Sequence, residues 1–159
     1  MKTERLDLLV PASEQPSLEK KAFTYPSWTL TERQICDLEL LLNGGFSPLK
    51  GYLSKSDYES VLETMRLSDG SLWPIPITLD VNREFSDNLK VGDSINLRDK
   101  EGFVLAVLTI SDIWIPDLKA EARAVFGTVD DTHPGVHYLL NVSHPVYVGG
   151  DLQGIFLPF

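Results

Sequence analysis

The chain has 159 residues, of which 43% are hydrophobic and 23% charged, as is typical of a soluble globular protein with one large or two small domains. Its 23 acidic and 14 basic residues give a formal charge of −9, and the scattered basic residues form no visible patch for nucleic acid. A single cysteine, Cys36, excludes a disulfide framework and a thiolate metal cage, and favours a cytoplasmic location. Asp7 interrupts the apolar run at the N-terminus, so we expect neither a signal peptide nor a membrane span there.

The first 28 residues are expected to form an extended arm on the surface, because three prolines lie among polar residues in 11–28. A capping box formed by Thr31 and Gln34 then predicts a helix over about 32–42. The apolar face of this helix consists of Ile35, Leu38, Leu41 and Leu42, which follow one another at helical spacing.

The segment NGGFSPLKGYL, residues 43–53, contains the glycines, serine and lysine of a phosphate-binding loop in the wrong arrangement. A P-loop has four residues between its glycines and a lysine after the second, whereas here five residues separate Gly45 from Gly51 and Lys50 precedes Gly51. We therefore predict a structural turn that ends the preceding helix, with glycine in the left-handed backbone conformation. The residues of this turn are Gly44, Gly45, Phe46, Ser47 and Pro48.

The rest of the chain mixes helices and strands without regular alternation. The predicted elements are, in chain order, a helix over about 57–66, a strand over 75–81, a buried strand over 103–110, helices over about 117–126 and 134–141, and two closing strands. A capping box at Ser56 and Glu59 opens the first of these helices, and Pro76 places the first strand at a sheet edge. This pattern predicts an α+β fold with a largely antiparallel or barrel-like sheet.

All three histidines lie within residues 133–144, and His133 and His137 have the spacing of two zinc ligands on one helical face. Pro134 occupies the place where a zinc peptidase helix has its glutamate, and Gly135 weakens the turn. Asp130 can equally cap the start of a short helix. We therefore expect hydrogen bonding within the loop rather than a metal site. His133 could cap backbone groups locally or reach another domain, and the sequence favours the local role.

Three segments of the chain resemble ATP sulfurylase, also called sulfate adenylyltransferase: LELLLNGGFSPLKGYL, VFGTVDDTHPGVHYLL and VYVGGDLQGI. They occur in the order of the family, and the resemblance covers essentially all 159 residues. The second segment contains the family's Asp-x-x-His-Pro-Gly-Val run as residues 130–136. Tyr52 is a minor departure, because the family usually has phenylalanine there.

This resemblance implies that residues 1–159 form one PUA-like N-terminal domain, a mixed β pseudo-barrel with several short flanking helices. In the family a catalytic domain follows, and the complete enzyme converts ATP, with Mg, and sulfate into adenosine 5′-phosphosulfate and pyrophosphate. The catalytic signature Gln-x-Arg-Asn-Pro-x-His does not occur in this sequence. We therefore expect no catalytic residue, metal or cofactor site in this chain, and no activity from the chain alone.

The expected partner is the catalytic domain of the full-length polypeptide, and a homo-oligomer and a fused adenylylsulfate kinase domain remain open. Nucleic acid and membranes are not expected partners. The alternative interpretation, suggested by the PUA-like fold, is a stand-alone module that binds nucleic acid or protein. Under the first interpretation, the candidates for structural motifs or domain contacts are Gly44, Gly45, Phe46, Ser47, Pro48, Asp130, His133, Pro134 and Gly135.

Overall fold

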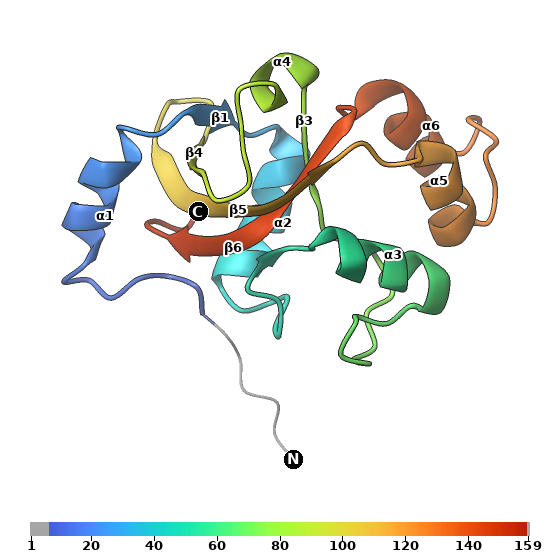
Figure 1. Ribbon diagram of the computed structural model, residues 1–159, viewed down its shortest axis with the longest axis horizontal. Coiled ribbons are helices and arrows are strands. Elements are labelled where there is room, and N and C mark those ends of the chain that lie inside the picture. Colours follow the sequence, from blue (N-terminus) through green and yellow to red (C-terminus); the bar gives the residue numbers. More distant parts are fainter. Residues whose placement is uncertain (1–6, 159) are drawn as a thin grey trace. The chain divides into compact units, whose positions relative to one another are not determined.

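The computed structural model describes residues 7–158 of the chain (Figure 1). The expectations for residues 1–6, which concern the start of the arm and of the N-terminal apolar run, lie outside these residues. Within the described part, no helix combines the length and the apolar character that crossing a membrane requires. The chain divides into two compact units. Of the described residues, unit 1 comprises 7–52, 90–111 and 150–158, and unit 2 comprises 53–89 and 112–149.

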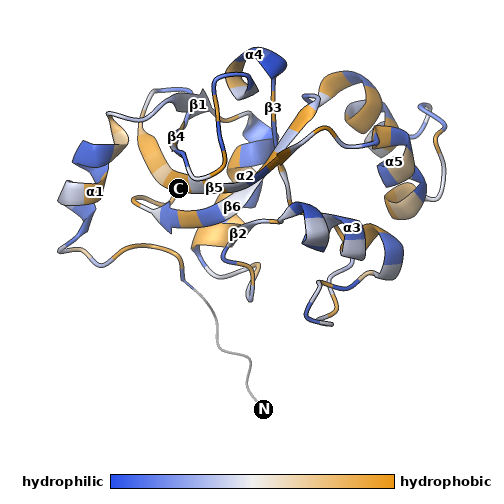
Figure 2. Cartoon of the chain, in the orientation of Figure 1, coloured by the Kyte–Doolittle hydropathy of each residue, from blue (hydrophilic) through white to orange (hydrophobic). Residues whose placement is uncertain are grey.

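Five strands follow the order β1-β4-β5-β6-β2. They belong to unit 1 except for residues 112–114 of β5 and 146–149 of β6, which belong to unit 2. Their bounds are Ser27–Thr29 for β1, Gly51–Tyr52 for β2, Ser94–Arg98 for β4, Val104–Trp114 for β5 and Val146–Gly154 for β6. β1 runs parallel to β4, whereas β4 is antiparallel to β5 and β2 is antiparallel to β6. The first residues of β5, Val104 to Leu108, are hydrophobic and buried, which confirms this part of the strand predicted over 103–110 (hydropathy in Figure 2). Phe103, which was predicted to be buried, lies before the strand and is 67% exposed. Gly92 and Gly102, in the turns on either side of β4, have positive φ angles of 96° and 91°.

Unit 1 contains two helices, α1 (Gln15–Ala22) and α2 (Glu32–Leu42). The prediction of an extended arm over residues 11–28 is therefore wrong for residues 15–22, which form α1. Pro16 lies in the first turn of α1, where a proline's missing N–H does no harm. The buried Asn96 side chain of β4 holds the end of α1, because its Nδ2 donates to the carbonyls of Ala22 and Tyr25 at 2.8 and 3.1 Å.

The start of α2 agrees with the predicted capping box. The Gln34 N–H donates to the Thr31 hydroxyl at 3.2 Å, and the Thr31 N–H donates to the Gln34 side-chain oxygen at 3.1 Å. Gln34 Oε1 also accepts the indole N–H of the buried Trp28 at 3.0 Å. The helix has Leu38, Leu41 and Leu42 fully buried, so its predicted apolar face is confirmed.

Unit 2 consists of short helices and one further strand. The bounds are Lys55–Thr64 for α3, Leu79–Val81 for β3, Arg83–Ser86 for α4, Leu118–Phe126 for α5 and Pro134–His137 for α6, and a turn of π-helix, Tyr138–Val142, follows α6. β3 pairs antiparallel with residues 146–148 of β6. The predicted helices over 117–126 and 134–141 are confirmed within two residues.

Two predictions in unit 2 require correction. The cap of α3 is Ser54 rather than Ser56, because the Ser54 hydroxyl accepts the Asp57 N–H at 3.2 Å. The strand predicted over 75–81 begins only at Leu79. Pro74 and Pro76 explain the shortening, since proline has no N–H to donate to a neighbouring strand. The α+β class itself is confirmed, with a mixed sheet of six strands. Over the described residues this sheet is not closed into a barrel.

Candidate functional site

The turn after α2 uses its backbone N–H groups internally. The N–H of Gly45 donates to Asn43 Oδ1 at 2.7 Å, and that of Phe46 donates to the Leu40 carbonyl at 3.0 Å. The N–H groups of Ser47 and Leu49 donate to the carbonyls of Gly44 and Phe46 at 3.1 and 2.9 Å. A phosphate loop needs such groups directed at the ligand. Pro48 contributes no N–H, so the four neighbouring N–H groups that could ring a phosphate are engaged within the turn instead.

Gly44 and Gly45 are both required by the turn, for different reasons. Gly44 has a φ of +84°, a left-handed conformation that favours glycine. At Gly45 an added Cβ would lie 2.9 Å from both Asn43 Oδ1 and Leu40 Cδ2. The Ser47 hydroxyl donates to the Gly44 carbonyl at 2.7 Å and closes the turn. The predicted helix end is confirmed, while a domain contact of these residues stays a prediction.

The turn from Asp130 to Gly135 is likewise held by local hydrogen bonds. Asp130 Oδ1 accepts the N–H and the hydroxyl of Thr132 at 3.0 and 2.9 Å, and the backbone hydrogen bond is the first cause that lowers the pKa of this carboxyl. His133 Nδ1 accepts the Gly135 N–H at 3.1 Å, so His133 caps the start of α6. Its ring lies 5.1 Å from that of Phe126. A Cβ at Gly135 would come within 2.7 Å of the same Phe126 ring.

The three histidines have separate surroundings. His133 caps α6, whereas His137 Nδ1 lies 3.3 Å from Asn141 Nδ2 on the next helical turn. His144 contacts Asp80, with 2.8 Å from its N–H and 3.0 Å from its Nδ1 to the same carboxylate oxygen. Among the residues described, no group of three or more His, Cys, Asp or Glu side chains could hold a metal ion. The geometry of His133 thus supports its local role, and its contact with another domain stays untested.

Unit 2 contains a cluster of aromatic side chains around one buried glutamate, which the sequence did not predict. Glu121 of α5 is 7% exposed, and its Oε1 accepts the hydroxyls of Tyr58 at 2.5 Å and Tyr147 at 2.8 Å. The two tyrosine rings lie edge to face, 5.5 Å apart, and the Trp114 ring lies 5.6 and 5.8 Å from them. Glu121 lies three residues after Leu118 and one before the buried Ala122, a spacing that indicates the inner face of α5.

Burial dominates the electrostatics of this cluster. It raises the pKa of Glu121, while the hydrogen bonds from Tyr58 and Tyr147 oppose the rise and the charge of Asp80 adds to it. Burial and the neighbouring Glu121 raise the pKa values of both tyrosines above their ordinary value of 10.0. The Glu121 side chain lies among aromatic rings and accepts hydrogen bonds from two tyrosine hydroxyls. These bonds connect α3, α5 and β6 within unit 2. We assign the cluster a structural role within unit 2.

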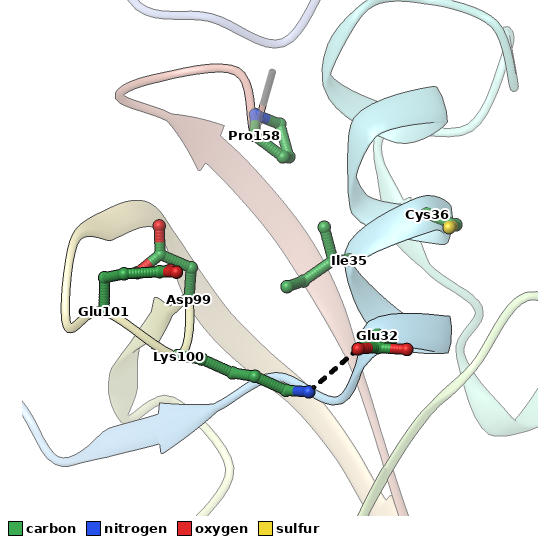
Figure 3. A pocket seen from close by; sticks show the side chains of 7 residues that line it. All are labelled: Glu32, Ile35, Cys36, Asp99, Lys100, Glu101 and Pro158. Atoms are coloured by element: carbon green, nitrogen blue, oxygen red, sulfur yellow. Dashed lines mark hydrogen bonds and ion pairs between the residues drawn. The ribbon is translucent and has the colours of Figure 1, made fainter.

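An open hollow lies in unit 1 between α2 and the turn that joins β4 to β5 (Figure 3). Its volume is about 380 Å³, and it is lined by Glu32, Ile35, Cys36, Asp99, Lys100, Glu101 and Pro158. Lys100 Nζ lies 3.1 Å from Glu32 Oε1, so the one cation of this lining already has an acidic partner. The hollow therefore offers little to an anionic substrate.

The fold agrees with a known domain class. A family model described as "PUA-like domain" matches residues 2–156, nearly the whole chain. The chain therefore belongs to the PUA-like domain family, and the PUA-like class implied by the sequence resemblance is confirmed, although the sheet of the described residues is not closed into a barrel.

Several curated relatives carry the name "Sulfate adenylyltransferase". The chain is 48% identical over 147 residues to "Sulfate adenylyltransferase" from Eremothecium gossypii, and 50% identical over 147 residues to the protein of that name from Schizosaccharomyces pombe. These matches cover 92% and 91% of this chain but 29% and 30% of the relatives. A solved structure described as "Hexameric APS kinase from Thiobacillus denitrificans" matches with a TM-score of 0.74 and 30% identity, over 97% of this chain and 26% of that chain. The chain thus spans less than a third of the length of these proteins.

Proposed function

We propose that this chain is the non-catalytic N-terminal domain of a sulfate adenylyltransferase, the enzyme that makes adenosine 5′-phosphosulfate and pyrophosphate from ATP and sulfate in sulfate assimilation. The observation that carries the proposal is the identity of about half over nine-tenths of the chain, combined with coverage of 25–30% of each relative. The chemistry is then supplied by the part of the enzyme that has no counterpart here.

The charge and the turn geometry support a non-catalytic role. Both substrates are anions, and their reaction needs positive groups aimed at phosphate oxygens, with Mg bound alongside ATP. This chain has a formal charge of −9, and the turn after α2 directs its donors inward. We therefore assign ATP, Mg and sulfate to the catalytic domain. The role of this domain is to support that catalytic domain or the contacts of an oligomer.

Two further features go with the proposal. The similar solved structure is that of a hexamer by its description, which supports an oligomeric parent enzyme. A sequence with a single cysteine supports a cytoplasmic location. The alternative of a nucleic-acid-binding module receives no support from the acidic charge. A gel shift at low salt tests it, because phosphate contacts are strongest there.

A genetic complementation experiment tests the proposal. A host that lacks sulfate adenylyltransferase is given either this 159-residue chain or the longer polypeptide of the same gene, with sulfate as the sole sulfur source. We expect growth only with the longer polypeptide. Growth supported by the short chain would refute the non-catalytic role, and failure of the well-expressed longer polypeptide would refute the assignment to sulfate adenylyltransferase.

A further inference from the structure

A second hollow in unit 1 adjoins the first and is distinctly apolar. We call it the hairpin groove, because it lies beside the turn between β4 and β5. Its volume is about 440 Å³, and it is lined by Asp99, Glu101, Phe103, Leu105, Phe156, Leu157 and Pro158. Asp99, Glu101 and Pro158 also line the first hollow, so the two form neighbouring recesses that share Pro158.

Large apolar side chains at this groove are exposed to an unusual degree. Phe103 is 67% exposed, Phe156 42% and Leu157 39%, while Leu105 lies buried below them. Single exposed apolar residues are ordinary, but two phenylalanines and a leucine that line one recess mark a contact surface. In Figure 3 the adjoining hollow shows Ile35 directed from α2 into the space beside Pro158. Ile35, which is half-buried, and Pro158 therefore contribute apolar side chains to the first hollow as well.

The groove is also preformed. Asp99 Oδ1 accepts the Phe103 N–H at 2.9 Å, and the Asp99 N–H donates to the Phe103 carbonyl at 3.0 Å, which fixes the turn. On the other side, the N–H groups of Ile155 and Phe156 donate to the Leu105 carbonyl at 2.8 and 3.1 Å. These bonds tie the last described segment to β5. The groove can receive a partner without first ordering its own backbone.

We propose that the hairpin groove is the docking surface for the catalytic part of the longer enzyme, formed by the polypeptide that follows this chain. This inference rests on the proposed function. About 70–75% of the length of each relative lies outside the match, so a large body is available to cover the groove. Phe156, Leu157 and Pro158 line the groove themselves, so polypeptide that continues from them starts at the groove.

The charges at the rim fit the same occupant. Asp99 and Glu101 border both recesses, in a chain that carries a formal charge of −9. An apolar centre with an acidic rim therefore suits a partner with an apolar patch and a basic surrounding.

Hydroxyl-radical footprinting of phenylalanine side chains tests the docking. The oxidation rates of Phe103 and Phe156 are compared between the 159-residue chain and the longer polypeptide, whose pyrophosphate release is measured in parallel. We expect both residues to be protected in the longer polypeptide at all protein concentrations. Equal oxidation in an active longer polypeptide would overturn the groove assignment while leaving the proposed function intact. Protection that disappears on dilution would assign the groove to a second copy instead.

A pair of matched variants makes the test specific. Phe103→Ser in the longer polypeptide should remove the protection of Phe156, because it deletes the most exposed apolar side chain of the groove. Val91→Ser is the control, since Val91 is 63% exposed in the same unit but lines neither recess. Both variants should leave the melting temperature of the 159-residue chain unchanged. Retained protection of Phe156 in Phe103→Ser, or its loss in Val91→Ser, would contradict the proposal.

Discussion

Replacing Glu121 by alanine removes the carboxylate that accepts the hydroxyls of Tyr58 and Tyr147. Each buried hydroxyl left without a partner costs about 1–3 kcal/mol, so two give an upper range of about 2–6 kcal/mol. Water can enter the space that the shorter side chain vacates, which reduces the loss. We therefore expect Glu121→Ala to lower the free energy of unfolding by about 2–4 kcal/mol.

The same cluster predicts a pH dependence. Burial raises the pKa of Glu121 from its ordinary value of 4.5, so the folded state holds this proton more tightly than the unfolded state. Stability from this group is therefore fully present below the unfolded pKa and is lost as pH rises through the raised folded pKa. A glutamine side chain cannot ionise, so the stability of Glu121→Gln should improve relative to the natural chain as pH rises from about 4.5.

Urea unfolding followed by tryptophan fluorescence measures both effects, because Trp114 packs against the cluster. Glu63→Gln is the matched control, since Glu63 is exposed on α3. This exposed substitution should change the free energy of unfolding by no more than about 0.5 kcal/mol. In a Tyr58→Phe, Tyr147→Phe background, Glu121→Ala should cost less, because no hydroxyl is then left unpaired. A stability difference for Glu121→Gln that does not vary with pH would refute the reasoning from burial.

The two turns, the strands shared by the two units and the charge of the chain lead to further predictions. Gly44→Ala should lower the free energy of unfolding by about 1–2 kcal/mol, because Gly44 has a φ of +84°. Gly45→Val should lower the melting temperature, because its Cβ would crowd Leu40. An unchanged melting temperature in either variant would contradict the turn assignment. His133→Ala should lower the free energy of unfolding by about 1 kcal/mol, whereas His133→Asn should retain most of that stability because asparagine can also cap the helix. Stabilisation of the chain by zinc would instead indicate a metal site. The chain should unfold in one transition when it is followed by near- and far-UV circular dichroism, because β5 and β6 contribute residues to both units. Two separate transitions would show that the units unfold independently. The purified chain should give no gel shift with nucleic acid at low salt, and a salt-sensitive shift would favour the alternative function.

Local signals in the sequence predicted most of the helices. The cap of α2 at Thr31 and the end of the same helix before Gly44 depend on residues only a few positions apart, and both are present. Asp117 and Gly127 likewise delimit α5. The α+β class follows from the same local patterns, because they distinguish short helices from alternating strands.

The features that could not be predicted depend on residues distant in the sequence. β1 pairs with β4, and Tyr58 reaches Glu121 across 63 residues, contacts that no local spacing encodes. A glutamate in a short helix is ordinarily exposed, so its burial becomes visible only when two hydroxyls are placed beside it. α1 escapes prediction because Pro16 also suits an extended arm, although the first turn of a helix accepts proline. The turns at 43–49 and 130–136 were predicted as structural, and their hydrogen bonds agree.

The central claim is that this chain belongs to a sulfate adenylyltransferase without carrying its chemistry. A pyrophosphate-release assay with ATP, Mg and sulfate tests it most directly, applied to the purified 159-residue chain and to the longer polypeptide at equal concentration. We expect sulfate-dependent pyrophosphate release from the longer polypeptide and none from the short chain. Sulfate-dependent turnover by the short chain, persisting after repurification to constant specific activity, would contradict it.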